Sequence, residues 1–445
     1  MLATLANAVL DFVAPVEAGQ SPAVLPRASS RRWSRMLPWL DSAGLSLYFL
    51  DALTRRNAAD DVPADFLDGL RHRKQQNRER ICRIEETFAA LNRQFTEEGV
   101  HYAALKGFSL VPDYCADASL RALSDLDYFI GESCLHRAQR ILAGHGYVLK
   151  KQTAEEFAFW IPSAEPTRED QQYSAASPFA IELHLSLWNS SYCELPALSL
   201  PISMEIQVRN YKGSEYCGLS DPEIFLFQIS HAFRHLMRGS VRPSWLLEIA
   251  RLSARRRQDA RFWADIARLA ASDDILGEMM GLIASMAAQV FEMPLPEALM
   301  PWRERVARPA RMWMERYARE WLIDSVCSNG FSAFPRNKLL LFLKEGYIRD
   351  AGPRLQSKRS SLYPWAGLSH LFERSRGQRV TRFAAIRKRW RWLASRLRYH
   401  AGANVRYGCE LPRWRWACRR GEFDGMERKR SGTPAATYLN GRLPT

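Results

Sequence analysis

Two aspartates one residue apart form the acidic pair most suited to chemistry in this chain. Asp125 and Asp127 begin the segment Asp125–Ile130, whose residues (Asp-Leu-Asp-Tyr-Phe-Ile) predict a β-strand. Because successive strand side chains point to opposite faces, both carboxylates would project to the same side. Two carboxylates this close repel each other unless a cation lies between them, and oxygen ligands suit Mg²⁺. The pair therefore predicts a divalent-metal site, although two solvated acids at a sheet edge would show the same spacing.

A third acid, Glu182, lies near the middle of another predicted strand. The segment 179–188 alternates apolar residues with others, which is typical of a strand with one buried face. Glu182 could supply a further oxygen ligand, and His184, two residues on, would share its face. The same alternation also fits a solvent-exposed Glu182 and a partly buried structural His184.

A lysine-glycine turn precedes the aspartate strand. Residues 100–105 predict a strand, Lys106 and Gly107 a turn, and residues 108–114 a short helix. A flexible turn, a lysine cation, the hydroxyl of Ser109 and the amides at a helix start are the ingredients of a phosphate cradle. Taken alone, Lys106 and Gly107 are only a turn.

These features occur in an order that resembles the polymerase-β-like nucleotidyltransferase superfamily. Within it, the chain is similar to a family of uncharacterised bacterial nucleotidyltransferases with the signature Leu-Lys-Gly-x-x-Leu, a Tyr, then Arg-x-x-x-Asp-Leu-Asp. The matching residues here are Leu105–Leu110, Tyr114 and Arg121–Asp127. The Ile-Glu-Leu-His segment 181–184 resembles the family's acid-apolar-His strand, and the likeness covers about residues 80–290.

The resemblance implies an α+β fold, with a mixed sheet flanked by helices and acids gathered at one edge. It also implies a metal-dependent enzyme that moves an NMP from an NTP to an acceptor hydroxyl and releases pyrophosphate. Asp125 and Asp127 would hold one Mg²⁺ or Mn²⁺ on the nucleotide phosphates. Asp127 and Glu182 would hold the second ion, which lowers the pKa of the acceptor hydroxyl. The sequence does not identify the acceptor or the base.

The same resemblance assigns the nucleotide phosphates to the turn. The residues that would bind or neutralise them are Lys106, Gly107, Ser109 and Arg121. Three residues depart from the family pattern. Phe108 is bulky where a small residue is usual, Glu182 is longer than the commoner Asp, and Glu248 stands where the helical section would have Asp.

Helical patterns surround this core. The predicted regions are an N-terminal helical region (1–98), a catalytic core (99–215), a helical domain (216–335) and a basic, partly helical tail (336–445). Further elements predicted within them are a long helix over 64–98, strands over 147–151 and 156–161, and helices over 223–237, 245–255, 261–271, 275–291 and 305–326. In the long helix, the polar stretch Arg71–Arg80 predicts a solvated face.

Two histidines lie one turn apart on the predicted helix 223–237. His231 and His235 have a spacing that can bind a metal, but no Glu follows His231 to complete a His-Glu-x-x-His pattern. The pattern favours structural histidines on a helix that packs against the catalytic sheet.

The positive charge of the chain is concentrated in its tail. The net charge is +15, and residues 374–430 hold 18 Lys and Arg against 4 Asp and Glu, which leaves +1 elsewhere. The body therefore makes no case for nucleic-acid binding. The tail interleaves cations with Trp, in Arg387–Trp392 and Arg413–Trp416. It would suit an amphipathic packing helix, an anionic membrane surface or, third, single-stranded nucleic acid.

Composition excludes a wholly disordered chain, a collagen, a small disulfide scaffold and a transmembrane protein. With 47% hydrophobic and 25% charged residues among 445, the chain resembles an ordinary globular protein, and no apolar stretch is long enough to span a bilayer. Eight scattered cysteines without a Cys-x-x-Cys pair fit reduced thiols in a cytoplasm. We expect a cytoplasmic protein whose tail could contact the inner face of the membrane. The alternative function is a catalytically inactive scaffold that keeps the fold, or an interaction protein associated with a membrane surface, which acts through partner contacts or through the basic tail.

Overall fold

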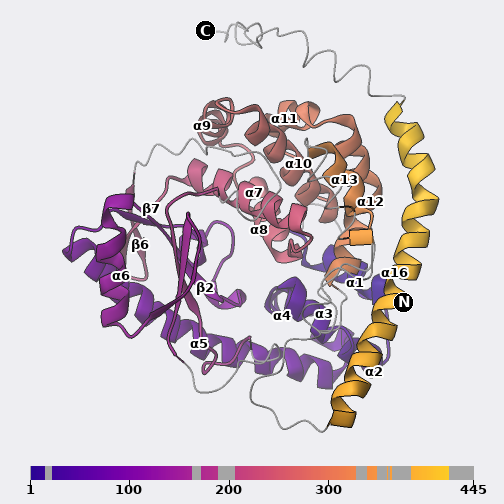
Figure 1. Cartoon of the computed structure of the whole chain (residues 1–445), viewed down its shortest axis with the longest axis horizontal. Helices are drawn as coiled ribbons and strands as arrows, with labels where there is room; N and C mark the ends of the chain where they lie inside the picture. The colour runs from indigo at the N-terminus through magenta and orange to yellow at the C-terminus, as the bar shows by residue number, and fades with distance from the viewer. Residues whose placement is uncertain are drawn as a thin grey trace, which may run out of the picture.

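The computed structural model describes residues 2–15, 23–162, 172–188, 206–326, 338–347, 358, 361–362 and 382–419. Within these residues the chain forms a mixed seven-stranded sheet with helices around it (Figure 1). The predicted α+β fold, with N-terminal helices and a helical C-terminal region, is therefore confirmed. The part of the predicted tail after residue 419 lies outside the described residues.

The sheet has the strand order β3-β4-β5-β2-β1-β7-β6. Its strands are β1 (Tyr102–Ala104), β2 (Asp125–Ile130), β3 (Val148–Gln152), β4 (Glu156–Trp160), β5 (Ala180–His184), β6 (Gln207–Tyr211) and β7 (Ser214–Gly218). Strand β2 runs parallel to β5 and β1 runs parallel to β7, whereas the other neighbours are antiparallel. The acid-bearing strands β2 and β5 are thus adjacent in the interior of the sheet.

The hairpin of β6 and β7 is absent from the sequence prediction. Strand β6 lies at the edge of the sheet, and most of its side chains are exposed, so it lacks the apolar alternation that marks β2 and β5. Its turn residues Lys212 and Gly213 both have positive φ, 51° and 87°, which tight two-residue hairpin turns require.

The described helices complete the fold. They are α1 (Leu2–Val13), α2 (Ser30–Ser34), α3 (Leu37–Ala43), α4 (Ser46–Arg55), α5 (Ala64–Glu97), α6 (Leu135–Gly144), α7 (Asp221–Arg238), α8 (Pro243–Arg255), α9 (Ala260–Ala270), α10 (Asp274–Val290), α11 (Met300–Arg305), α12 (Arg308–Val326), α13 (Leu340–Tyr347) and α16 (Arg382–Arg419). None of the helices in the described part of the chain has the length and apolar character needed to cross a bilayer.

Helix α5, 34 residues long, joins two hydrophobic cores (Figure 1). Near its C-terminus, Phe88 and Phe95 pack under the sheet, with ring centroids 6.3 and 5.4 Å from that of Tyr128 in β2. Near its N-terminus, Phe66 belongs to the core formed by α1 to α4 and the C-terminal helices. One helix therefore ties the sheet to the helical part of the molecule.

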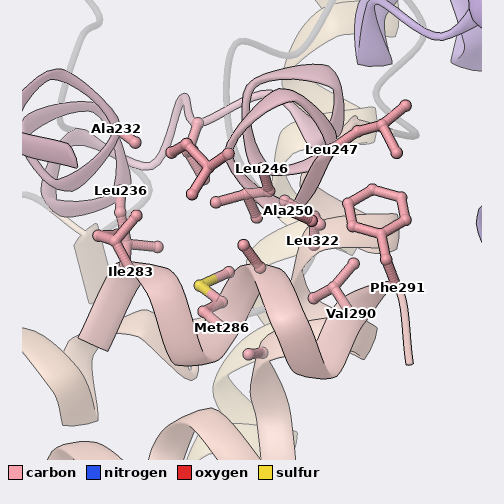
Figure 2. Close-up of a cluster of buried hydrophobic side chains, with 14 of the residues drawn as sticks. Ala232, Leu236, Leu246, Leu247, Ala250, Ile283, Met286, Val290, Phe291 and Leu322 are labelled. Atoms are coloured by element: carbon pink, nitrogen blue, oxygen red, sulfur yellow. The ribbon is translucent and has the colours of Figure 1, made fainter. Parts of the chain in front are cut away.

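Helix α7 stands between the sheet and the other helices. Figure 2 shows the apolar contact that holds it, formed by Ala232 and Leu236 of α7, Leu246, Leu247 and Ala250 of α8, and Ile283, Met286 and Val290 of α10. Burying this stripe leaves a different face of α7 for the sheet, because a helix presents side chains all around its axis. That second face carries the polar residues Gln228 and His231.

Candidate active site

The parallel pairing of β2 with β5 brings the predicted acids together. Asp127 lies in register with Glu182, and Asp125 lies in register with Ala180. Residues paired laterally in a sheet point to the same face, so these carboxylates share one side. One ligand atom from each of Asp127, Glu182 and His184 lies within 4.8 Å of the other two. Segments far apart in the sequence therefore form a single acidic cluster.

Asp127 is the most buried member, with a side chain that is 0% exposed. Its Oδ1 accepts a hydrogen bond from Lys106 Nζ at 2.9 Å and lies 3.0 Å from His184 Nε2. Its Oδ2 is buried and has no hydrogen-bond partner among the described residues. Burial alone would raise the pKa of Asp127, but Lys106 and His184 hold that pKa well below its usual range. The carboxylate is therefore charged.

The charge on Asp127 raises the pKa values of the two neighbouring acids, in addition to the effect of burial. Burial and then Asp127 raise the pKa of Asp125, while Lys106 and Arg242 oppose the rise. Burial, followed by Asp127 and Asp125, raises the pKa of Glu182 to about 8. Asp125 and Glu182 both line the cavity described below. Asp127 thus disfavours a further negative charge on Asp125 and on Glu182, and a cation placed between these carboxylates would relieve that repulsion.

A divalent cation fits this cluster. The unpartnered Oδ2 of Asp127 is a buried acceptor, and such atoms are costly unless a donor or cation satisfies them. Carboxylate oxygens are the ligands that Mg²⁺ and Mn²⁺ prefer, and Glu182 places a second carboxylate within reach of Asp127. His184 adds a nitrogen ligand.

Gly107 shapes the turn that follows β1. Its φ is +66°, a conformation that favours glycine, while a Cβ would meet no atom closer than 3.8 Å. The backbone conformation, rather than lack of space, therefore accounts for glycine here. A 3₁₀ turn over Gly107–Leu110 replaces the short helix predicted over 108–114, so no helix start faces the site at this point. Gly107 and Lys106 both line the cavity.

Ser109 lies deeper than predicted. It is buried, and its hydroxyl donates to the Lys106 carbonyl at 3.3 Å. The described residues that line the cavity do not include Ser109. The bulky Phe108 points into the core, where its ring centroid lies 4.8 Å from those of Phe88 and Tyr211. Phe108 therefore does not obstruct the cavity.

Arg121 is held by an acid from the helical part of the chain. Its Nε donates to Glu248 Oε1 at 2.8 Å, and the Tyr48 hydroxyl donates to the same oxygen at 2.6 Å. Burial alone would lower the pKa of Arg121, but Glu248 raises it above its usual value. Arg121 also donates to the Gly107 carbonyl at 3.4 Å. It links the turn to α8, and Glu248 serves as its structural partner.

Helix α5 fixes the segments that lead into the acid-bearing strands. Asn77 and Arg80 are 0% and 2% exposed, so the prediction of a solvated face over Arg71–Arg80 is wrong at these positions. Asn77 Nδ2 donates to two carbonyls, and the Arg80 guanidinium reaches several more. The acceptors include the backbone carbonyls of Ser119, Arg121, Leu123 and Pro178. Polar residues were needed inside because these strand-entry carbonyls require donors.

A cavity of about 270 Å³ opens between the sheet and the helices. Its sheet wall includes Lys106, Gly107, Asp125 and Glu182, with Asp127 lying behind them. Its helical wall includes Gln228, His231, Arg234, His235, Arg238, Arg242 and Trp245. The acids of the sheet and residues of α7 and α8 therefore line the same cavity.

The α7 wall was not recognised from the sequence. Gln228, His231, Arg234 and Arg238 recur every three or four residues, so they share one face of α7. The spacing was available in the sequence, but the sheet opposite this face was not. The interpretation of His231 and His235 as purely structural is incomplete, because both line the cavity. Burial, then Lys106, lowers the pKa of His231, and burial, then Arg234, lowers that of His235 to about 3.

Residues 29–292, more than half of the chain, match the family of uncharacterised nucleotidyltransferases. The matched region begins just before α2 and ends just after α10, so it contains the sheet, both walls of the cavity and the acidic cluster. The family resemblance predicted over residues 80–290 is confirmed and extends further toward the N-terminus. No curated protein matches the chain.

Proposed function

The chain belongs to the family of uncharacterised nucleotidyltransferases, and from this premise we propose that it transfers an NMP from an NTP to an acceptor hydroxyl. The observation that carries the proposal is the buried Asp127 carboxylate, with an unpartnered Oδ2, in register with Glu182 beside a cavity. A buried carboxylate oxygen without a protein donor is costly, and a bound cation would satisfy it.

The reaction follows from the chemistry of the substrates. The acceptor oxygen forms a bond to the α-phosphorus of the NTP, the bond to the bridging oxygen breaks, and pyrophosphate leaves. The hydroxyl proton passes to water. Mg²⁺ or Mn²⁺, when bound by Asp125, Asp127 and Glu182, supplies charge stabilisation at phosphorus and lowers the pKa of the acceptor hydroxyl.

Lys106 has two successive roles in this scheme. In the metal-free protein its ammonium is the counter-charge of Asp127, 2.9 Å from Oδ1. Burial alone would lower the pKa of Lys106, but Asp127, Asp125 and Glu182 raise it above its usual value, so it is charged. With a cation bound to Asp127, the Lys106 ammonium would be free to neutralise the phosphates from the cavity wall that it shares with Gly107.

The test follows labelled phosphate from the NTP. The protein is incubated with each α-labelled NTP and Mg²⁺ or Mn²⁺, and both pyrophosphate release and labelled product or self-modification are measured. We expect Asp127→Asn to lose activity. Asp265→Asn, the same chemical change at a partly exposed residue of α9 paired with Arg268, should retain it.

A catalytically inactive scaffold makes the opposite prediction. If the wild-type protein neither releases pyrophosphate nor binds any NTP in the presence of divalent metal, the transferase proposal is refuted. The scaffold interpretation then accounts for the retained fold.

A further inference from the structure

The cations around the cavity differ in whether the protein already neutralises them. Lys106 is paired with Asp127, and Arg121 is paired with Glu248, in contacts of 2.9 and 2.8 Å. Arg234 and Arg242 also line the cavity, but within the described residues neither forms an ion pair with a carboxylate. These two guanidiniums are therefore available to an anionic ligand, whereas Arg121 would have to leave a buried acid.

Two buried donors on the same wall also lack acceptors. The Nε of Arg234 and the Nε2 of Gln228 are buried without a hydrogen-bond partner among the described residues. Gln228 is only 5% exposed, and it lies on the face of α7 that lines the cavity. Buried donors without acceptors are costly, so this wall is suited to a ligand rich in acceptor oxygens.

Arg242 is positioned by an aromatic ring. Its guanidinium lies 5.6 Å from the ring centroid of Trp245, a distance at which a cation interacts favourably with the ring face. Arg242 also acts on the acidic cluster, since it opposes the rise in the pKa of Asp125 that burial and Asp127 cause. Arg242 and the acidic cluster therefore lie on the same cavity and interact electrostatically.

We propose that Arg234 and Arg242, assisted by the Gln228 amide, bind the β- and γ-phosphates of the NTP. The inference rests on the proposed function and changes its phosphate site, because the resemblance had assigned the phosphates to Lys106, Gly107, Ser109 and Arg121. Guanidinium groups match phosphate oxygens in charge and geometry, and the departing pyrophosphate gains negative charge as the bond to the α-phosphorus breaks. Arg121 is instead a positioning residue that holds the Gly107 turn against Glu248.

The test uses inorganic triphosphate as the probe, with binding to the full chain measured by titration calorimetry. Arg234→Gln and Arg242→Gln should each weaken binding about 10-fold or more, since each removes a charge-assisted contact. Arg268→Gln, at an arginine of α9 whose side chain is 70% exposed, should bind as the wild type does. Circular dichroism and the thermal midpoint establish that each variant is folded.

The outcomes separate this inference from the proposed function. If Glu182→Gln abolishes transfer but still binds triphosphate, while Arg234→Gln does not bind it, the phosphate site stands whatever the reaction. If both arginine variants bind triphosphate as tightly as the wild type, the inference is overturned. It is also overturned if they bind triphosphate normally but show a raised KM for the acceptor only.

A second, independent observation concerns the outward face of α16. The inner face packs against the body, where Tyr407 and Trp414 stack on Phe342 with centroid distances of 4.8 and 5.0 Å. On the outer side, large apolar residues are exposed by 44 to 67% of their surface: Trp390, Leu397, Val405 and Trp416. Their spacings of seven, eight and eleven residues place them on one stripe of the helix. Figure 1 shows α16 along the edge of the molecule remote from the sheet.

Arginines flank this stripe. The exposed ones are Arg387, Arg391, Arg398, Arg413, Arg415 and Arg419. The sequence of α16 contains a single acid, Glu410. It accepts from the Tyr317 hydroxyl at 2.8 Å and pairs with Arg316 at 3.3 Å and with Arg413 at 3.4 Å, so Arg413 alone among the exposed arginines named above has a carboxylate of this helix as a partner. We infer that this face docks on an anionic membrane surface, with Trp390 and Trp416 at the interface and the arginines toward the headgroups.

Vesicle flotation of the full chain tests this docking surface. The protein should float with vesicles of phosphatidylcholine and phosphatidylserine, less so as salt is added, and not with phosphatidylcholine alone. The double variant Trp390→Ala, Trp416→Ala should lose about 10-fold or more in partitioning. Arg71→Gln, at an exposed arginine of α5, serves as the control. Absence of flotation overturns the inference, as does retention of single-stranded DNA without retention of anionic vesicles.

Discussion

Replacing Glu182 by glutamine should stabilise the metal-free protein while it removes a metal ligand. Glu182 lies in register with Asp127, and its side chain is only 21% exposed. Burial, then Asp127 and Asp125, raise the pKa of Glu182 from 4.5 to about 8. Between these values the native state holds a proton that the unfolded state releases. The contribution of Glu182 to stability is therefore complete below about pH 4.5 and is lost as pH rises toward 8.

The size of the effect follows from that window. Across about two pH units between pH 5.5 and 7.5, full linkage of one proton corresponds to about 2.5 kcal/mol. Because the Glu182 side chain is partly exposed, solvent screening reduces the expected change in the free energy of unfolding to about 1–2 kcal/mol. Glutamine keeps the shape but does not ionise. The free energy of unfolding of Glu182→Gln relative to the wild type should therefore rise by about 1–2 kcal/mol over this pH range.

Urea unfolding with EDTA present, followed by tryptophan fluorescence, measures this difference at both pH values. Glu97→Gln, the same change at an exposed position of α5, should show no such pH dependence. If Glu182→Gln differs from the wild type by the same amount at both pH values, Glu182 does not share a charged cluster with Asp127. The same conclusion follows if the variant is less stable at pH 7.5.

Three further changes test how the site is built. Asp127→Asn should lower the free energy of unfolding of the metal-free protein by about 3 kcal/mol, because it leaves the buried Lys106 ammonium without its counter-ion; a loss below about 1 kcal/mol in urea would contradict the ion pair. Arg80→Met should also cost about 3 kcal/mol or more, since several buried carbonyls lose their donor, and wild-type urea stability would refute the role assigned to α5. His235→Gln should reduce acid sensitivity: burial, then Arg234, lower the pKa of His235 to about 3, so the unfolded state binds more protons below about pH 6.5 and the wild type loses stability as pH falls. Between about pH 7.5 and 5.5 the wild type should lose about 1 kcal/mol more than this variant, and equal losses would show that His235 titrates normally.

The acidic cluster could be predicted because its signal is local. Alternation along a strand places Asp125 with Asp127, and Glu182 with His184, whichever strands are neighbours. That β2 and β5 are adjacent and parallel is a long-range fact, with Asp127 opposite Glu182. The pattern of single strands does not contain it, and only the family resemblance anticipated it.

The helical wall shows where sequence patterns end. Gln228 and Arg234 have the spacing of an ordinary polar helix face, and the pattern does not say whether that face meets water or a cavity. The prediction that Arg80 is solvated was wrong for a related reason. A polar residue on a long helix is usually exposed, and the helix pattern does not show that carbonyls distant in the sequence accept hydrogen bonds from this one. Ser109 illustrates a third limit, because the local turn geometry decides whether its hydroxyl reaches the cavity or the Lys106 carbonyl.

The account depends most on whether Asp127 and Glu182 capture a divalent cation. Electron paramagnetic resonance of free Mn²⁺ measures this directly, since bound Mn²⁺ loses its sharp six-line signal. We expect the wild-type protein to deplete the free signal and Glu182→Gln to bind Mn²⁺ about 10-fold more weakly or worse. Equal Mn²⁺ binding by the two proteins, or no binding by the wild type, would contradict the proposed metal site.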